Sequence, residues 1–509
     1  MRLLRRNALG VYGVYAAAIV SGLVVTPVVV HALGKAGYGA WSVIGAATIY
    51  LSVLDFGLGP AVVRFAAEAR GRRAVADVNE IASSGLALYG AIGLISLPLG
   101  AALAWTLPWF ARVPHHLVWD TRVATLLVVV SLALRFPLGL FNNLLVAQQR
   151  WDLQNLGNFV STVLYAVLVA VLMPNGGGLV LLGGLTLGTS LVRLALPLLW
   201  LRRELPELAV GRRFVTRARL RELTTFGSSN FLVHLAQKIV FSTDVIVVGI
   251  VLGVRQAAVY GVASKLFALA FGIGTAATSL MFPAFAELEG AEDRERQRRL
   301  LLSGLRAGSA LMLLLALPLL LIPDLLIRAW IGGGYHGSYG VAAILAGVLL
   351  VHQPIYVLTQ FLIARARQRE VAVASIVTTG VNLALSFVLA WVWGIKGVAV
   401  STLVTDALML VWIVPRYAAP AAGIRSGTLG RALLRPAVPA AVGAAAVLVV
   451  LARWWSPQSL AALAPLGALW VAVCLALVWS LGLAPSERAR FRAELFRGRV
   501  AQPAAADTV

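Results

Sequence analysis

The sequence predicts an all-α polytopic membrane protein of about fourteen transmembrane helices. Of its 509 residues, 60% belong to the hydrophobic set and 13% are charged, and the mean hydropathy is +0.87. Soluble domains are about 45–50% apolar, so this composition excludes a single soluble core. Apolar stretches recur at the length, about 20 residues, that crosses a bilayer as a helix. The single cysteine, Cys474, excludes an internal disulfide and a cysteine metal cluster.

Each expected helix is an apolar stretch bounded by charges or by Gly and Pro clusters. The first follows MRLLRR and continues to Val30. That length is too great for the apolar part of a signal peptide, so we interpret it as an uncleaved helix. In chain order the expected helices are 8–30, 38–63, 81–107, 122–145, 155–174, 178–200, 223–252, 257–281, 301–322, 340–363, 370–392, 396–415, 433–452 and 461–482.

The distribution of Lys and Arg predicts the orientation in the membrane. With a cytoplasmic N-terminus, most basic residues fall on the cytoplasmic side, and the richest segments are 201–222 and 282–306. Both termini are therefore expected in the cytoplasm. The net charge of +22 then matches anionic lipid headgroups rather than a nucleic acid. The outer segments hold only Lys35, Arg112, Arg122, Arg255, Arg328, Lys396 and Arg453.

Three sequence correspondences indicate an internal repeat. Leu-Gly followed by Tyr-Gly occurs after the first expected helix, in HALGKAGYGAW, and again after the seventh, in IVLGVRQAAVYGVA. LLVAQQRWDLQN resembles FLIARARQREVAV, and GGLVLLGGLTLGTSLV resembles IKGVAVSTLVTDALML, at nearly the same separation. We therefore expect a six-helix lobe at 1–222, which includes a basic cytoplasmic linker, and a second lobe at 223–420. Residues 421–509 add helices 13 and 14 and a basic cytoplasmic tail. Parallel repeats of this kind occur in transporters that rock two halves around a central site.

Asn7, the turn ALGKAGYGAW, YLSVLDFGLGPAVVRFAAE and DVIVVGIVLGVRQAAVYGVASKL together resemble the polysaccharide flippase branch of the multidrug/oligosaccharidyl-lipid/polysaccharide exporter superfamily. This branch includes O-antigen and exopolysaccharide flippases. The resemblance implies a V-shaped transporter in the bacterial inner membrane. It would move an undecaprenyl-pyrophosphate-linked oligosaccharide from the cytoplasmic to the periplasmic leaflet. Membrane lipids and polysaccharide polymerase or assembly proteins are the expected partners. Relatives move drugs or the peptidoglycan lipid precursor, so the cargo stays open.

Basic residues inside the expected helices are the candidate substrate ligands. A charge at a helix centre costs about 2.5–3.5 kcal/mol, so such residues normally face a bundle interior or a watery cavity. Lys265 lies near mid-depth, where an ammonium can contact a pyrophosphate without demanding one planar geometry. The resemblance supports this role, because related lipid-precursor flippases use cationic residues in the central cavity. Snorkelling, or pairing with Asp or with another helix, is the structural alternative. The candidates are Lys265, Lys238, Arg135, Arg193 and Arg64.

Three acidic residues inside the helices, Asp55, Asp244 and Asp406, are the candidates for coupling or gating. A buried carboxylate that is not paired can take up a proton or a cation. Asp55 and Arg64 would lie on opposite faces of a regular helix. Pro60 is expected to kink that helix, which would turn both groups toward the cavity or form a hinge. For Arg64 the alternative is an anchor at the cytoplasmic end.

The sequence predicts a transporter and not an enzyme, with no catalytic residues, metal site or cofactor. It has no GxxxxGK[ST] phosphate loop, and its outer segments are too short for a catalytic domain. A multidrug/cation antiporter of the same superfamily is the first alternative, although it would need few buried bases. A non-transporting component of an envelope polysaccharide assembly complex is the second. Energy is expected from an ion gradient or the membrane potential.

Overall fold

The structure is a computed structural model, and it is helical throughout the part of the chain that it describes. It describes the backbone of residues 2–278, 281–434, 445–449 and 460–477; the side chains of 2–12, of 228–242 and of part of 460–477 are outside this description. In the described part, 9 helical segments are long and apolar enough to cross a membrane. The all-α multi-pass membrane fold is therefore confirmed.

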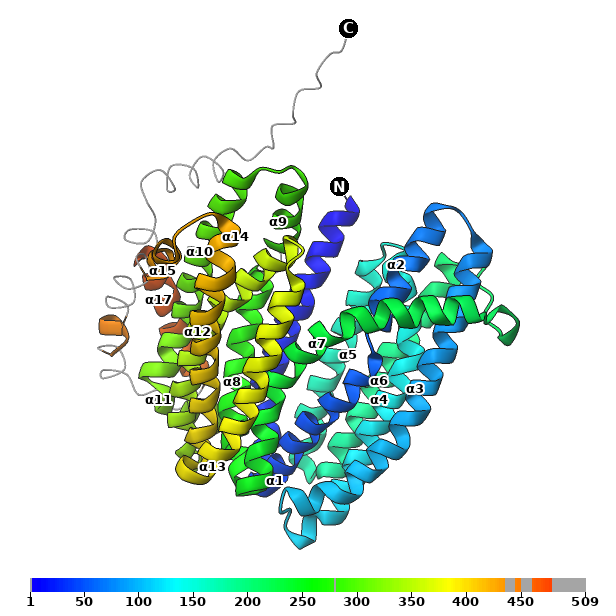
Figure 1. Ribbon diagram of the computed structural model, residues 1–509. Coiled ribbons are helices and arrows are strands. Elements are labelled where there is room, and N and C mark those ends of the chain that lie inside the picture. The colour runs from blue at the N-terminus through cyan, green and yellow to red at the C-terminus, as the bar shows by residue number, and fades with distance from the viewer. Residues whose placement is uncertain (1, 279–280, 435–444, 450–459, 478–509) are drawn as a thin grey trace.

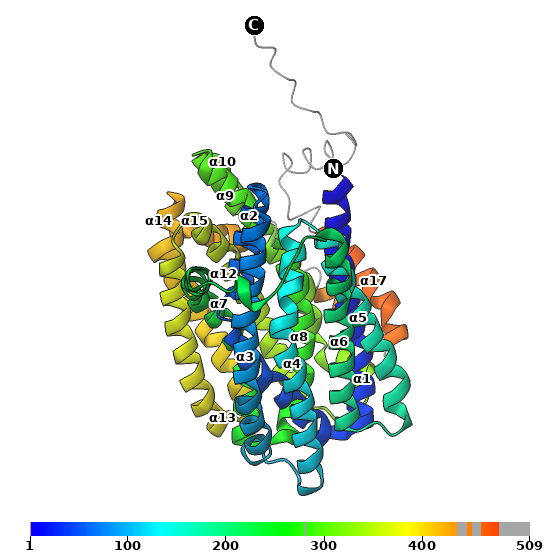
Figure 2. The ribbon, with the colours of Figure 1, turned by 90° about the vertical axis from the view of Figure 1, so that its right-hand side faces the viewer.

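The first half of the chain forms one group of helices, which Figure 2 shows from the side. In that view α3, α4 and α6 run side by side, and contacts between α3 and α4, α4 and α6, and α5 and α6 agree with it. The elements are α1 (Arg2–Leu51), the 3₁₀ helix η1 (Ser52–Asp55), α2 (Leu58–Gly71), α3 (Val75–Phe110), η2 (His115–Leu117), α4 (Val118–Ala147), α5 (Trp151–Leu172), η3 (Met173–Asn175), α6 (Leu179–Glu204) and η4 (Arg212–Phe214).

The second half forms the other group, and Figure 1 shows the ribbons of the two groups diverging toward the start of α1. The expected helix at 433–452 lies largely outside the described residues, as does the basic tail. The elements are α7 (Arg217–Leu252), α8 (Val254–Thr278), α9 (Met281–Gly290), α10 (Arg294–Leu321), α11 (Pro323–Ile331), α12 (Gly337–Ala364), α13 (Gln368–Ile413), the π-helical turn η5 (Val414–Ala418), α14 (Ala419–Ala422), α15 (Ser426–Leu434) and α17 (Leu460–Leu477).

The repeat seen in the sequence is also present in the backbone. Gly34, which divides α1, has φ 64° and ψ −176°, and its counterpart Gly253 has φ 86° and ψ 168°. Glycine adopts this region without steric cost. In the second pair of repeat segments, Gln149 and Ala366 occupy equivalent places after α4 and α12, and both are left-handed, with φ 62° and 56°. Two correspondences of the repeat are thus confirmed, whereas the lobe boundaries stay a prediction.

The two ends of the bundle differ in charge. The α2–α3, α4–α5, α9–α10 and α12–α13 connections lie near the start of α1 (Figure 1) and carry arginines such as Arg72, Arg150, Arg294 and Arg367. We call this the basic end. Connections rich in Lys and Arg alternate along the chain with connections that contain few of them, as the sequence predicts. Which end faces the cytoplasm stays a prediction.

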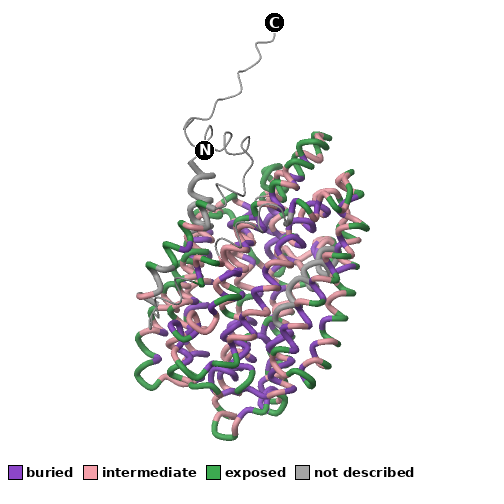
Figure 3. Tube along the Cα trace, turned by 90° about the vertical axis from the view of Figure 1, so that its left-hand side faces the viewer, coloured by how far each residue is buried: buried purple, intermediate pink, exposed green. Residues whose placement is uncertain are grey.

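The hydrophobic core explains why the two groups diverge. One large cluster of buried residues unites both groups at the end opposite the basic end, where Val43 and Ala111 pack with Val254 and Leu345. Toward the basic end the core splits into two clusters. One belongs to α2, α3 and α4, and the other to α9, α10, α12 and α13. Figure 3 shows buried segments running through the bundle and exposed residues on its outer faces. The groups are therefore joined at one end only.

At the joined end, which we call the sealed end, backbones touch directly. The Val254 N–H donates a hydrogen bond of 2.9 Å to the Ala111 carbonyl oxygen. A Cβ on Gly39 would clash with the carbonyl oxygen of Val254, and one on Gly249 would lie 2.9 Å from Val43 Cγ2. Helices in a membrane approach this closely where small residues line the interface.

The connection between the two groups is fixed to α3. Asn79 Oδ1 accepts a hydrogen bond of 2.9 Å from the Ala209 N–H, and Ser83 Oγ accepts one of 3.2 Å from the Gly211 N–H. At the start of α7, Arg219 donates to Glu222, which raises the pKa of Arg219 above its ordinary value. Arg219 also contacts Asp77 and Glu80 on α3. The first turns of α7 therefore belong mechanically to the N-terminal helices.

The break in the second expected helix lies before Pro60 rather than at it. The chain passes through η1, and then Phe56 (φ 46°) and Gly57 (φ 71°) take left-handed conformations before α2 begins. Pro60 falls in the first turn of α2, where a missing N–H removes no helical hydrogen bond. The proline kink was therefore wrong, and Gly57 forms the break instead. A Cβ there would also lie 2.8 Å from the carbonyl oxygen of Gly227 on α7.

We predict that Gly39→Ala opens the sealed end. Its methyl group would displace the Val254 carbonyl, and overpacking of this kind costs about 1–3 kcal/mol, or about a tenfold rise in the open fraction. A cysteine at Val43, which is buried, placed in a background without Cys474, should then react faster with a water-soluble maleimide in nanodiscs. Gly45→Ala is the matched control, because no atom lies within 4 Å of a Cβ there. Equal labelling of the two variants would refute the seal.

Candidate functional site

A cluster of polar side chains is buried in the C-terminal helices around Asp244. Its carboxylate is 3% exposed. Asp244 Oδ2 accepts hydrogen bonds from the Tyr260 hydroxyl, at 2.7 Å, and from the Thr402 hydroxyl, at 2.9 Å. The other carboxylate oxygen, Oδ1, has no hydrogen-bond partner among the described residues. The site thus holds a carboxylate in place while one oxygen stays available to a proton or a cation.

Asn382 of α13 extends this cluster. Its side-chain amide donates to the hydroxyls of Thr402 and Thr405, both at 3.2 Å. Asn382 Oδ1 lacks a partner among the described residues, although the residue is 2% exposed. Because Thr402 bonds to both Asp244 and Asn382, the two unsatisfied acceptor atoms belong to one connected network. Unsatisfied buried acceptors are unusual, and they often mark a site for a proton, ion or water.

Asp406 forms the second acidic position of the cluster. Asp406 Oδ2 lies 2.8 Å from Nδ1 of His352, which comes from α12. The imidazole also packs edge-to-face against Phe271 of α8, with the ring centroids 5.1 Å apart. Asp406 and Asp244 are close enough to interact electrostatically. The structure therefore brings together two of the predicted coupling residues and adds a histidine between helices.

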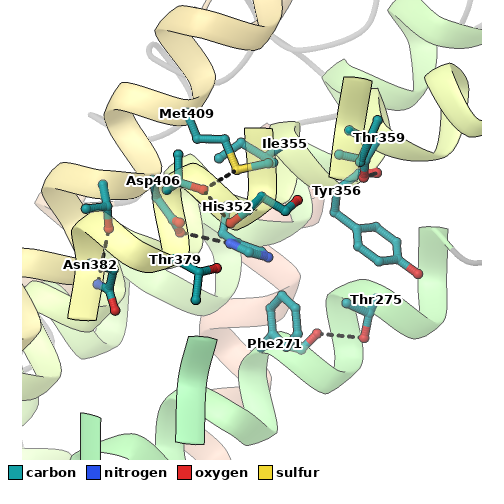
Figure 4. Close-up of a pocket in the computed structure, with 14 residues that line it drawn as sticks. Phe271, Thr275, His352, Ile355, Tyr356, Thr359, Thr379, Asn382, Asp406 and Met409 are labelled. Atoms are coloured by element: carbon teal, nitrogen blue, oxygen red, sulfur yellow. Dashed lines mark hydrogen bonds and ion pairs between the residues drawn. The ribbon is translucent and has the colours of Figure 1, made fainter. Parts of the chain in front are cut away.

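A cavity of about 280 Å³ borders this cluster. Its walls come from α8, α12 and both halves of α13 (Figure 4). Asp406, His352 and Asn382 line one side of the cavity, and the aromatic side chains Phe271 and Tyr356 line another. The cavity thus combines a hydrogen-bonded carboxylate and imidazole, hydroxyl and amide groups, and apolar ring surface.

The N-terminal helices carry a second polar cluster, and it is mainly basic. Asp55, at the end of η1, hydrogen bonds with Tyr89 of α3, and Asn143 of α4 donates to the Tyr89 hydroxyl at 3.4 Å. Arg135 of α4 interacts electrostatically with Tyr89 and with Arg193 of α6. Asp55 therefore belongs to a cluster with Tyr89, near Arg135.

Lys265 lies on α8 with an exposed side chain. Residues four apart share a helix face, and Leu269 on this face lies against Gly22 of α1. Lys265 is therefore on the face turned toward α1, which contacts both helix groups. Lys265 forms no ion pair with any residue that the structure describes. An accessible ammonium without an acidic partner is suited to an anionic ligand.

Of the remaining predicted ligands, Arg64 has a structural contact, and the side chain of Lys238 is not described. Arg64 places its guanidinium 4.8 Å from the Phe226 ring centroid and 5.4 Å from that of Phe65, so it bridges α2 and α7. This contact is a cation–π interaction and gives Arg64 a structural reason to lie there. For Lys238 the structure describes the backbone only. His352, Tyr89 and Asn143 were missed by the sequence reasoning, although an ionisable histidine inside an apolar helix is itself a detectable signal.

Comparisons with known proteins concern the family and the fold of the chain. Residues 4–289 match the family model "Polysaccharide biosynthesis protein". No curated protein matches the chain. The structure of the lipid II flippase MurJ in an inward closed conformation has a TM-score of 0.71 at 11% identity, over 96% of this chain and 98% of that one.

Two multidrug transporter structures are also similar. An inward-facing multidrug resistance MATE family transporter of the MOP superfamily gives a TM-score of 0.66 at 15% identity, over 82% of this chain and 95% of that one. An outward-facing structure of such a transporter gives 0.56 at 16% identity, over 84% and 96%. At these identities the likeness shows the fold. The family model covers more than half of the sequence, and so this chain belongs to the polysaccharide biosynthesis protein family.

Proposed function

We propose that the protein is a flippase that moves an undecaprenyl-pyrophosphate-linked oligosaccharide from the cytoplasmic to the periplasmic leaflet of the bacterial inner membrane. The observation that carries the proposal is the divided core, which joins the two helix groups at the sealed end and separates them toward the basic end. Membership of the polysaccharide biosynthesis protein family supports the cargo class. With the basic end in the cytoplasm, this conformation receives its cargo from the cytoplasmic leaflet.

Alternating access follows from this division of the core. Opening the sealed end while the two separate clusters at the basic end come together would expose the headgroup on the other side. The higher similarity to an inward-facing transporter than to an outward-facing one supports an inward-open assignment. Since the 205–216 connection is held on α3, the motion takes place beyond the start of α7 and not within 201–222. Phe226, which packs with the N-terminal core, is near the last residue held on that side.

The basic groups provide the attraction for the cargo. Lys265 from the C-terminal helices, and Arg135 and Arg193 from the N-terminal helices, contribute positive charge within the membrane. A pyrophosphate bound between them is held by ammonium and guanidinium contacts, which are stronger than neutral hydrogen bonds. The polyprenyl tail stays in lipid while the headgroup crosses. Arg64 supports the α2–α7 contact.

Coupling is assigned to the acidic cluster. The free Oδ1 of Asp244 can accept a proton or coordinate a monovalent cation. A charge gained there moves with the C-terminal helices, and the membrane potential then acts on it at about 2.3 kcal/mol per charge per 100 mV. Asp406, already bonded to His352, responds to the same event through its electrostatic interaction with Asp244. Asp55 links η1 to α3 and acts in gating.

A multidrug/cation antiporter is the second candidate, because one observation favours it. The cavity beside Asp406 combines a carboxylate with aromatic and thioether side chains, as a site for a lipophilic cation would. Against it stands His352, which already occupies Asp406 Oδ2, and the basic N-terminal cluster. A non-transporting component of an envelope assembly complex, or one that works beside a polymerase, would have no use for two charged clusters within the membrane-spanning helices.

The proposal is tested in proteoliposomes that contain an undecaprenyl-pyrophosphate oligosaccharide. An impermeant sugar-oxidising reagent reports how fast the headgroup of the inner leaflet becomes reachable. Protein-dependent exposure is expected, accelerated by an imposed ion gradient or potential. If no exposure occurs with any of several glycans, while a fluorescent lipophilic cation is exported, the antiporter replaces the flippase.

We predict that Lys265→Glu lowers the translocation rate at least about tenfold, since a charge reversal next to a pyrophosphate costs more than about 1.4 kcal/mol. Lys265→Arg should keep most of the rate because the positive charge is retained. Lys396→Glu, a charge reversal at an exposed lysine near the sealed end, is the matched control. The same loss in Lys396→Glu, or no loss in Lys265→Glu, would contradict the assignment.

We also predict that Asp244→Asn uncouples translocation from the ion gradient. The asparagine oxygen can still accept the Tyr260 and Thr402 hydrogen bonds, so folding should persist, but the site no longer carries a titratable charge. Translocation rates with and without an imposed proton or sodium gradient should become equal. Asp324→Asn, which removes an exposed carboxylate paired with Arg328, is the control and should respond like the wild type. A gradient response kept in Asp244→Asn would exclude Asp244 as the coupling group.

A further inference from the structure

The cavity in the C-terminal helices has a chemical character that the coupling role of Asp244 does not require. It lies on the Asp406 side of the polar cluster, and its wall includes threonine hydroxyls from α8, α12 and α13. In Figure 4 the Tyr356 ring extends from α12 toward the segment of α8 that carries Thr275. Specific small-molecule sites are concave, largely apolar, and contain a few well-placed polar groups. This cavity meets each of these conditions.

The hydroxyl groups around the cavity can still bind a ligand. Thr275 and Thr378 donate to backbone carbonyls of their own helices, at 3.0 and 2.8 Å, so their oxygen lone pairs are left as acceptors. Thr379 Oγ1 and Asn382 Oδ1 have no partner among the described residues. Asn382 is almost fully buried, so its unsatisfied acceptor points to a missing donor rather than to bulk water. Such a lining is suited to a ligand rich in hydroxyl groups.

The hydrogen bond between His352 and Asp406 in the wall decides between a neutral and a cationic ligand. His352 Nδ1 lies 2.8 Å from Asp406 Oδ2, so the charge of this carboxylate is already compensated by hydrogen bonding within the protein. A lipophilic cation would have to displace the imidazole to gain that charge. A neutral polyol can instead add hydroxyl contacts to both groups while they stay paired. Phe271 and Tyr356 then supply ring surface for the apolar C–H face of such a ligand.

The position of the cavity relates it to the proposed phosphate ligand. Lys265 and Thr275 lie on α8 ten residues apart, which corresponds to about 15 Å along the helix and about 80° around it. Thr275 is on the basic-end side of Lys265, because α8 runs from the sealed end toward that end. Tyr356 interacts electrostatically with Tyr15 of α1, so the cavity lies next to the helix that contacts both groups. A glycan whose pyrophosphate is bound at Lys265 would extend toward this cavity.

We propose that this cavity is a saccharide subsite, which receives a sugar several residues from the pyrophosphate and so selects the glycan that is moved. The inference rests on the proposed flippase function and adds a determinant of specificity to it. Asn382, His352 and Asp406 bind ring hydroxyls, Thr275 and Thr378 accept from others, and Tyr356 covers the ring face. Because of the separation from Lys265, a single sugar on the pyrophosphate does not reach the subsite, whereas a chain of several sugars does.

The test compares the affinities of three lipids for the full-length protein in nanodiscs, measured by native mass spectrometry. The probes are undecaprenyl pyrophosphate, the same lipid with one N-acetylglucosamine, and a panel of tetrasaccharide-linked forms. The bare and one-sugar lipids should bind alike, and at least one tetrasaccharide form should bind about tenfold more tightly or better. Thr275→Leu fills the cavity, and Thr378→Val removes a hydroxyl from its wall. In both variants the ratio of the affinity for the tetrasaccharide form to that for the bare lipid should fall toward one, while the affinity for the bare lipid is unchanged.

Controls separate the possible failures. Thr106→Val removes a hydroxyl that bonds in the same way to its own helix, on α3, and should keep the preference; Thr378→Ser should restore it. If the bare lipid binds but no tetrasaccharide is preferred, or the preference survives Thr275→Leu, the subsite is refuted and the flippase stands. If no lipid binds, the flippase itself fails. Tight binding of tetraphenylphosphonium that is lost in Thr275→Leu would instead make the cavity a cation site.

Discussion

The close contact between backbones at the sealed end is the constraint on which the rest of the molecule depends. The hydrogen bond from the Val254 N–H to the Ala111 carbonyl forms only because Gly39 allows the two helix groups to meet without an intervening side chain. In a bilayer, lipid tails compete with apolar side chains on equal terms, so packing and backbone hydrogen bonds decide which helices adhere. A joint made of such contacts can also be separated without exposing charged groups. The divergence of the groups toward the basic end follows from it.

The two polar clusters divide the work between the helix groups. The N-terminal cluster is mainly basic, with Arg135 and Arg193 near each other, whereas the C-terminal cluster is built on Asp244 and Asp406. Charges inside a membrane are costly, and two clusters of opposite sign are retained only where something compensates them. In the proposed mechanism an anionic headgroup compensates the basic side, and a proton or cation compensates the acidic side. Lys265 belongs to the C-terminal helices, on α8, but is assigned to the anionic headgroup.

Helix α7 belongs to both groups, and this determines where the protein can bend. Its first turns are tied to α3 through Arg219, and Phe226 packs with the N-terminal core. Its last turns hold Asp244 among the C-terminal helices. From its composition, 201–222 is expected to be a basic linker between the lobes. The contacts of Arg219 with carboxylates of α3, and side chains such as Asn79 that accept from the linker backbone, attach this segment to α3. The amino-acid composition of a segment gives its charge, but it does not show which side chains or backbone groups that segment contacts.

The sequence by itself determined the membrane fold, the alternating basic connections and the repeat, because hydropathy, charge and glycine spacing are local properties of the chain. It also placed Asp244 and Asp406 inside helices, since an ionisable residue in an apolar stretch is visible without any partner. Only the tertiary structure showed that they lie close enough to interact, that His352 pairs with Asp406, and that Asp55 joins Tyr89. These contacts depend on the rotation and depth of helices far apart in sequence. That information arises from packing between helices, and no periodicity within one helix contains it.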